Sequence, residues 1–243
     1  MEETLYLGIL SLTGSNFSLQ YLENFFEFYN KKKSKEGLKN KINIILHSVA
    51  ENYLKFEESE IRKEIIKCLN DFRLINVYHL IIPSSEMFVF KDLFLSNSNA
   101  KLDFYFSVIE SVNVIKNSSL KKVAIISTGN SFENKVFQDQ LDGLNVQYFC
   151  NDNLLEMINE VIICSKQSGI NAHVNRVFNN ILAYLSLNQC DSILIDNFDI
   201  RKIFQINKAK THLKILDTFD ILNEQVLKSL LFMKNSENYK TAL

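Results

Sequence analysis

Short apolar runs alternate with longer segments of helical periodicity along the whole chain. Most of the short runs are continuously apolar, which is typical of parallel strands that helices cover on both faces. They lie at Leu5–Leu10, Ile42–Leu46, Val77–Ile82, Lys101–Phe106, Val123–Ile126, Val146–Cys150, Ser192–Ile195 and Leu213–Leu216. The order strand, helix, strand, helix predicts an α/β protein with mainly parallel sheets.

The segments between these strands carry apolar residues at three- and four-residue spacing, which indicates amphipathic helices. The expected helices are Phe17–Tyr29, Ile61–Phe72, Phe132–Leu141, Leu154–Cys164, Val174–Leu187 and Ile221–Phe232. With 243 residues, 47% of them hydrophobic, the chain can bury one large core or two cores of roughly 100 residues each.

A faint internal repeat favours two cores. Leu7–Gly14 is similar to Val123–Asn130, because each is a strand that runs into a small, hydroxyl-rich turn and then a helix. A second strand end follows in each half, at Ser84 and at Asn197. Ligands of open α/β sheets sit outside the carboxyl ends of the strands. The repeat therefore predicts two similar halves whose strand-end turns share a ligand cleft.

Charge and hydropathy exclude several partner classes. The formal net charge is −1, so nothing favours nucleic acid or an anionic membrane. Lys31–Lys41 is lysine-rich but lacks interleaved aromatic residues, and we interpret it as a solvated loop. The apolar runs are far shorter than the roughly 20 residues that cross a bilayer, and the Met-Glu-Glu start lacks the basic residues of a secretory signal. We expect a cytoplasmic protein without nucleic-acid or membrane partners.

The cysteines give no sign of a metal site. Cys68, Cys150, Cys164 and Cys190 show no CxxC spacing and do not cluster with histidine in the sequence. We expect reduced thiols that pack as small apolar groups, and no bound metal.

Several segments, in order, resemble the aspartate/glutamate racemase family over nearly the whole chain. Each motif is weak alone, but together their order and spacing are specific. They are Gly8–Ser15, Ile45–Val49, Ile82–Met87, Val123–Asn130, Phe137–Leu141, Ile195–Ile200 and Leu216–Thr218.

The resemblance implies two Rossmann-like lobes related by a pseudo-twofold axis, with a ligand cleft between them. The first lobe would comprise residues 1–117 plus 214–243, and the second residues 118–213. Family members racemise amino acids without a cofactor such as pyridoxal phosphate, and they commonly form homodimers. The resemblance thus implies no cofactor and a homodimer.

The family places one catalytic cysteine in each of two turns, and this chain has Ser84 and Asn197 at those positions. One thiolate removes the Cα proton while the opposite thiol delivers another, so both groups must exchange protons near neutral pH. A thiol with a reference pKa near 8.5 can do so. A serine hydroxyl is a far weaker acid and an amide carries no useful proton, so the thiol mechanism is excluded.

The same resemblance marks substrate-binding positions, and several also have a structural interpretation. Glu86 is favoured as a first-turn helix acid, and Asp199, Ser84 and Ser85 are favoured as helix caps. His47 is open between a cleft-lining group and an ordinary hydrogen-bonded histidine. The full set of binding candidates is Ser11, Thr13, His47, Ser48, Ser85, Glu86, Thr128, Phe198 and Asp199.

Two functions of different class remain. In the first, the chain is a racemase-like protein without the two-thiol machinery, catalytically inactive or repurposed to bind a small molecule such as an amino acid or small carboxylic acid. In the second, it is an active isomerase or lyase, independent of pyridoxal phosphate, that uses a non-cysteine acid-base pair. The substitutions at Ser84 and Asn197 leave open whether the chain is an enzyme.

Overall fold

The structure is a computed structural model that describes residues 4–36, 41–48, 55–97, 102–207 and 211–240. The chain divides into two compact units. The first comprises Met1–Glu110 together with Phe219–Leu243, and the second comprises Ser111–Thr218.

The first unit contains a four-stranded parallel sheet in the order β2-β1-β3-β4. Its strands are β1 (Thr4–Ser11), β2 (Lys41–Ser48), β3 (His79–Ile82) and β4 (Asp103–Phe106). Every residue of β3 is buried, as expected for a central strand that helices cover on both faces.

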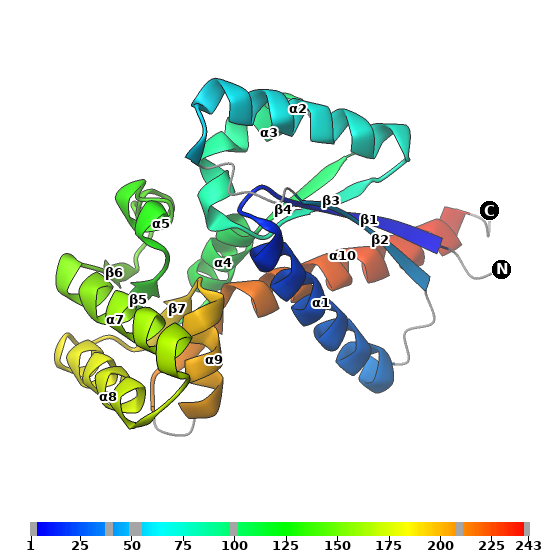
Figure 1. Cartoon of the computed structure of the whole chain (residues 1–243). Helices are drawn as coiled ribbons and strands as arrows, with labels where there is room; N and C mark the ends of the chain where they lie inside the picture. The colour runs from blue at the N-terminus through cyan, green and yellow to red at the C-terminus, as the bar shows by residue number, and fades with distance from the viewer. Residues whose placement is uncertain (1–3, 37–40, 49–54, 98–101, 208–210, 241–243) are drawn as a thin grey trace. The chain divides into compact units, whose positions relative to one another are not determined.

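Helices cover both faces of this sheet, with α2 and α3 on one side and α1 and α10 on the other (Figure 1). The helices of the unit are α1 (Ser15–Glu36), α2 (Glu58–Leu74), η2 (Ser85–Phe90), α3 (Lys91–Ser96) and α10 (Thr218–Lys240). Helix α4 (Ser107–Lys116) runs across the boundary into the second unit.

Gly8 of β1 lies where the sheet and α2 pack most closely. A Cβ atom at this position would come within 2.8 Å of Leu80, 2.9 Å of Val77 and 3.0 Å of Phe72. Glycine is therefore required by space rather than by backbone conformation, because contacts below 3.0 Å force neighbours to move.

The second unit repeats the first in topology. Its parallel sheet has the order β6-β5-β7-β8, which becomes β2-β1-β3-β4 when four is subtracted from each number. The strands are β5 (Lys122–Ile126), β6 (Gln147–Phe149), β7 (Ser192–Ile195) and β8 (Lys214–Asp217). The predicted α/β class with two similar parallel halves is confirmed.

The helices of the second unit enclose its own apolar core. They are α5 (Gly129–Glu133), α6 (Gln138–Leu141), α7 (Asp152–Ser168), α8 (Ala172–Leu187) and α9 (Phe198–Asn207). Buried residues of α7, α8 and α9 pack with Ala124, Ile126, Ile193 and Ile195 of the sheet. Phe178 and Phe204 meet edge to face with ring centroids 4.6 Å apart.

The structure differs from the sequence-based expectations in three places. The strand Lys214–Asp217 pairs with β7, so the chain leaves the second sheet at residue 218 rather than 213. The helix expected over Phe132–Leu141 is broken into α5 and α6, with Lys135 at a φ of 49° between them. Lys31–Lys35, expected in a loop, forms the last turns of α1, since long charged side chains are compatible with an exposed helix.

Within the described part of the chain, no helix combines the length and apolar character needed to span a membrane. Lys101, at the start of an expected strand, lies outside the described residues.

Candidate functional site

The turn after β1 is held by its own hydroxyl groups. Ser11 is fully buried, and its Oγ lies 3.2 Å from Oγ1 of Thr13. Gly14 has a φ of 101°, in the region that favours glycine. Its carbonyl oxygen accepts hydrogen bonds from the backbone N–H and the hydroxyl of Ser18 at 3.3 and 3.0 Å.

His47 and Ser48, two neighbouring candidates at the end of β2, point to opposite faces of the sheet. The hydroxyl of Ser48 lies 2.6 Å from the hydroxyl of Ser18 on α1. His47 instead lies against α2, with Nε2 3.5 Å from Oε1 of Glu64 and its ring 6.2 Å from that of Phe72. Alternate side chains of a strand point to opposite faces of the sheet, so Ser48 shares the α1 side of the sheet, whereas His47 belongs to the α2 side.

The turn after β3 carries Ser84, where the resemblance implies that the family has its first catalytic cysteine. Ser84 is 5% exposed and stands at the N-cap of η2, although its side chain makes no capping hydrogen bond. Ser85 is buried and Glu86 is partly exposed, in the first turn. Ser84 thus holds the N-cap position without capping the helix through its side chain, and Glu86 is the expected first-turn acid. The roles of Ser85 and Glu86 in binding stay a prediction.

In the second unit, Thr128 follows β5 and caps α5. Its Oγ1 accepts a hydrogen bond of 3.2 Å from the backbone N–H of Ser131. A small hollow of about 10 Å³ lies near this turn, lined by Ser127, Cys150 and Asn151 with apolar neighbours. This volume suits about one water molecule and not an amino acid.

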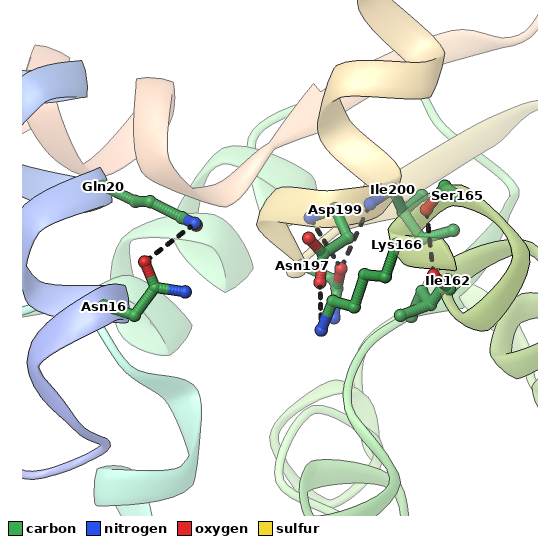
Figure 2. Close-up of polar contacts among 8 residues, drawn as sticks. All are labelled: Asn16, Gln20, Ile162, Ser165, Lys166, Asn197, Asp199 and Ile200. Atoms are coloured by element: carbon green, nitrogen blue, oxygen red, sulfur yellow. Dashed lines mark hydrogen bonds and ion pairs between the residues drawn. The ribbon is translucent and has the colours of Figure 1, made fainter. Parts of the chain in front are cut away.

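The turn after β7 carries Asn197, where the resemblance implies that the family has its second catalytic cysteine. Oδ1 of Asn197 accepts hydrogen bonds from the backbone N–H groups of Asp199 and Ile200 at 2.9 and 3.1 Å, as Figure 2 shows. The side chain is thus an N-cap of α9, the arrangement that asparagine favours at helix starts. Figure 2 also shows Lys166 of α7 reaching Asp199, whose Oδ2 lies 3.0 Å from the lysine Nζ.

Further polar contacts stabilise the turn after β7. Thr218 donates a hydrogen bond of 2.9 Å to Asp196, and both residues are buried. Arg201 pairs with Asp217 at the end of β8, and both side chains are largely buried. Arg201 also lies over the ring of Phe198, 5.9 Å from its centroid, and Phe198 itself is 7% exposed.

Phe198 is therefore a buried ring in contact with a cation. Asp199 has a cationic partner, as an acid in the first turn of α9. The sequence favours Asp199 as the helix cap, but Asn197 caps α9 and Asp199 lies within its first turn. Whether either residue contacts a ligand stays a prediction.

The sequence analysis did not identify Lys166 and Arg201, the basic residues that pair with Asp199 and Asp217. Arg201 could have been inferred, since it lies in the first helical turn after the strand-end motif. Lys166 has no sequence signal, because it lies 33 positions before Asp199 on another helix (199 − 166).

The arrangement can position polar groups but offers no thiol at Ser84 or Asn197. Cys150 and Cys190 lie elsewhere in the second unit, and burial raises the pKa of each thiol. Both therefore stay protonated at neutral pH, as structural buried cysteines do.

Comparison with known proteins identifies the fold. No protein-family model matches the chain, and no curated protein matches it by sequence. Among solved structures, an aspartate racemase homologue from Pyrococcus horikoshii is similar with a TM-score of 0.74 at 14% identity, over 92% of this chain and 97% of that chain. Picrophilus torridus aspartate racemase is similar with a TM-score of 0.70 at 15% identity, over 93% and 94%.

A glutamate racemase from Francisella tularensis, solved in complex with D-glutamate, is similar with a TM-score of 0.61 at 17% identity, over 95% and 82%. The chain thus has the fold of aspartate and glutamate racemases across nearly its full length. At these identities the similarity concerns the fold alone.

Proposed function

We propose that this chain is a racemase-like protein that has lost the two-thiol reaction and binds a small amino acid or carboxylic acid. The proposal takes Ser84 and Asn197 as the substituted catalytic positions. It takes the remaining turn residues as the ligand contacts, namely Ser11, Thr13, His47, Ser48, Ser85, Glu86, Thr128, Phe198 and Asp199.

One observation carries the proposal, which is the capping role of Asn197. Its carboxamide oxygen is used by two backbone N–H groups of α9. A carboxamide does not exchange protons near neutral pH, and here it is also held in place by the helix it caps. Racemisation needs a proton carrier on each face of Cα, and this position supplies none.

The polar contacts of the turn after β7 support the proposal that the chain still binds a small molecule. Asp196, Arg201 and Lys166 all have partners within the unit. Lys166 is 63% exposed, so its ammonium can turn from Asp199 to an incoming carboxylate at little cost, since exposed ion pairs are weak. A carboxylate ligand is therefore the chemistry this turn suits best.

The proposal includes binding without a cofactor, homodimerisation and a cytoplasmic location. Light scattering on the purified chain tests the dimer. A mass near that of one 28.2 kDa chain over the micromolar range would argue against it.

Incubation in deuterium oxide tests the loss of catalysis. We expect no Cα deuterium and no racemisation, by NMR and chiral chromatography, with either enantiomer of aspartate or glutamate. Exchange at Cα with any of these amino acids would instead establish the alternative, an active isomerase or lyase with a non-cysteine acid-base pair.

A thermal-shift screen of amino acids and small carboxylic acids tests the binding. A ligand that binds only the folded chain raises the melting temperature by mass action. We expect a hit whose shift is reduced in Lys166→Met and unchanged in Lys202→Met, which alters an exposed lysine of α9. Equal shifts in both variants would remove Lys166 from the binding site.

A further inference from the structure

His47, Glu64 and Cys68 bring three metal-ligating atoms together on the α2 side of the first sheet. Glu64 and Cys68 are four positions apart on α2, so they occupy the same helix face. His47 projects from β2 toward that face, where its ring contacts Phe72. Glu64 and Cys68 are not among the binding candidates named above, whereas His47 is one of them.

The distances match a single coordination sphere. Oε1 of Glu64 lies 3.5 Å from Nε2 of His47 and 3.9 Å from Sγ of Cys68. The three ligating atoms all lie within 4.8 Å of one another. Tetrahedral Zn²⁺, with bonds of about 2.0–2.3 Å, places its ligand atoms roughly 3.3–3.8 Å apart. The His47–Glu64 distance already lies in this range and the Glu64–Cys68 distance lies just above it. The ligand atoms of His47 and Cys68 lie within 4.8 Å of each other and would approach further when an ion binds.

The exposure of the three residues gives a path for an ion. The Cys68 side chain is fully buried, whereas the side chains of His47 and Glu64 are 25% and 16% exposed. An ion can therefore approach from the His47 and Glu64 side and meet the thiol beneath. Three protein ligands leave the fourth position of a tetrahedral ion to water.

The charged neighbours of the cluster are compatible with a cation. Lys67 lies 3.5 Å from Oε1 of Glu64, but its side chain is 65% exposed and can move into solvent. Burial raises the pKa of Cys68 to about 12, with the charges of Glu64 and Asp71 adding to the effect. The thiol therefore binds a metal only by giving up its proton, and a coordinated Zn²⁺ deprotonates a thiol outright.

We propose that His47, Glu64 and Cys68 form a binding site for Zn²⁺ or a cation of similar softness, with one open coordination position. Imidazole and thiolate select such ions over Mg²⁺ and Ca²⁺, which prefer oxygen ligands. The site would tie β2 to α2 and goes beyond the small-molecule binding proposed above.

Cobalt titration of the chelator-treated full chain tests the proposal directly. Co²⁺ in a site with a thiolate ligand gives a sulfur-to-metal charge-transfer band in the near ultraviolet. We expect this band to saturate at one equivalent, to disappear in Cys68→Ser and to persist in Cys164→Ser, which alters a partly exposed cysteine. The absence of a band in the native chain would overturn the proposal.

Because Cys68 is buried and its variant could unfold, a second measurement uses the outer ligands. Zn²⁺ should raise the melting temperature of the native chain and of His173→Gln, a histidine 41% exposed that pairs with Glu160. The shift should be lost in His47→Gln and Glu64→Gln, and Mg²⁺ should cause none. An equal Zn²⁺ shift in native chain and Glu64→Gln would show binding elsewhere and refute the site.

Discussion

Tyr21 of α1 donates a hydrogen bond of 2.6 Å to Oδ1 of Asn223 on α10, across 202 positions of sequence. Asn223 in turn donates a hydrogen bond of 2.9 Å to Oδ1 of Asn24. All three residues are buried. This polar chain fixes the C-terminal helix to the first unit.

Tyr21→Phe should lower the free energy of unfolding by about 1–3 kcal/mol, because it leaves a buried amide oxygen without its donor. Chemical denaturation measures the change. Tyr6→Phe is the matched control, since Tyr6 is 43% exposed and its hydroxyl can bond to water. Equal effects of the two substitutions would mean that the Tyr21 bond contributes nothing.

Gly8→Ala should destabilise the chain by about 1–3 kcal/mol through overpacking, since the new methyl group would press on Leu80 and Val77. Gly129→Ala is the control, because a Cβ there has nothing within 4 Å. That substitution should be neutral or stabilising, as alanine favours a helix. An unchanged free energy of unfolding in Gly8→Ala would show that the side chains around Gly8 shift at little cost.

Asn197→Ala should cost about 1 kcal/mol, because α9 loses the cap that satisfies two backbone N–H groups. Asn197→Asp should be nearly neutral, since aspartate accepts the same hydrogen bonds. Urea denaturation of both variants provides the comparison. Equal losses in the two variants would assign the effect to the amide nitrogen instead of the cap.

Arg201→Met should destabilise the second unit far more than Lys166→Met does. The Arg201–Asp217 pair has side chains only 11% and 13% exposed, and removing one member of a buried pair costs about 3 kcal/mol. Lys166 is 63% exposed, so losing its pair with Asp199 should cost less than about 1 kcal/mol. Thermal unfolding monitored by circular dichroism ranks the two, and the reverse order would contradict the burial argument.

His79 should make the protein less stable as the pH falls below neutral. Burial lowers the pKa of His79 from its usual 6.5, while the charge of Asp103 opposes this in part. Below pH 6.5 the unfolded chain takes up the proton first, so the unfolding free energy decreases with falling pH until the lower folded pKa is passed.

Denaturation between pH 7.5 and 5 measures this slope. The slope should be reduced in His79→Gln and kept in His173→Gln, whose histidine is 41% exposed. Because the hydroxyl of Tyr105 lies 3.2 Å from Nδ1 of His79, glutamine preserves a polar partner. A slope of the same size in His79→Gln would assign it to other groups.

The eight expected strands all occur. The apolar runs of β3 and β7 are buried throughout, as expected for central strands that helices cover on both faces. The single helix expected over Phe132–Leu141 forms as two helices, because apolar spacing does not reveal the turn at Lys135. Lys214–Asp217 was expected in the first lobe, but pairing with β7 depends on backbone hydrogen bonds that a short run does not encode.

The candidate turns could be found in the sequence because they follow the strands, but their contacts could not. The capping of α9 by Asn197 is local and was within reach of sequence reasoning. The pairs Lys166–Asp199 and Arg201–Asp217 join separate elements, so they exist only once the helices pack.

By itself, the sequence determined the order of the strands and the repeat of two similar halves, and it placed Ser84 and Asn197 at two strand ends. These depend on residue type and local spacing. Only the tertiary structure decided which residues contact adjacent side chains of a strand. Ser48 contacts α1, whereas His47 lies beside Glu64 and Cys68 of α2. The alternation of a strand separates two adjacent side chains, and the helix packed on each face determines what each one contacts.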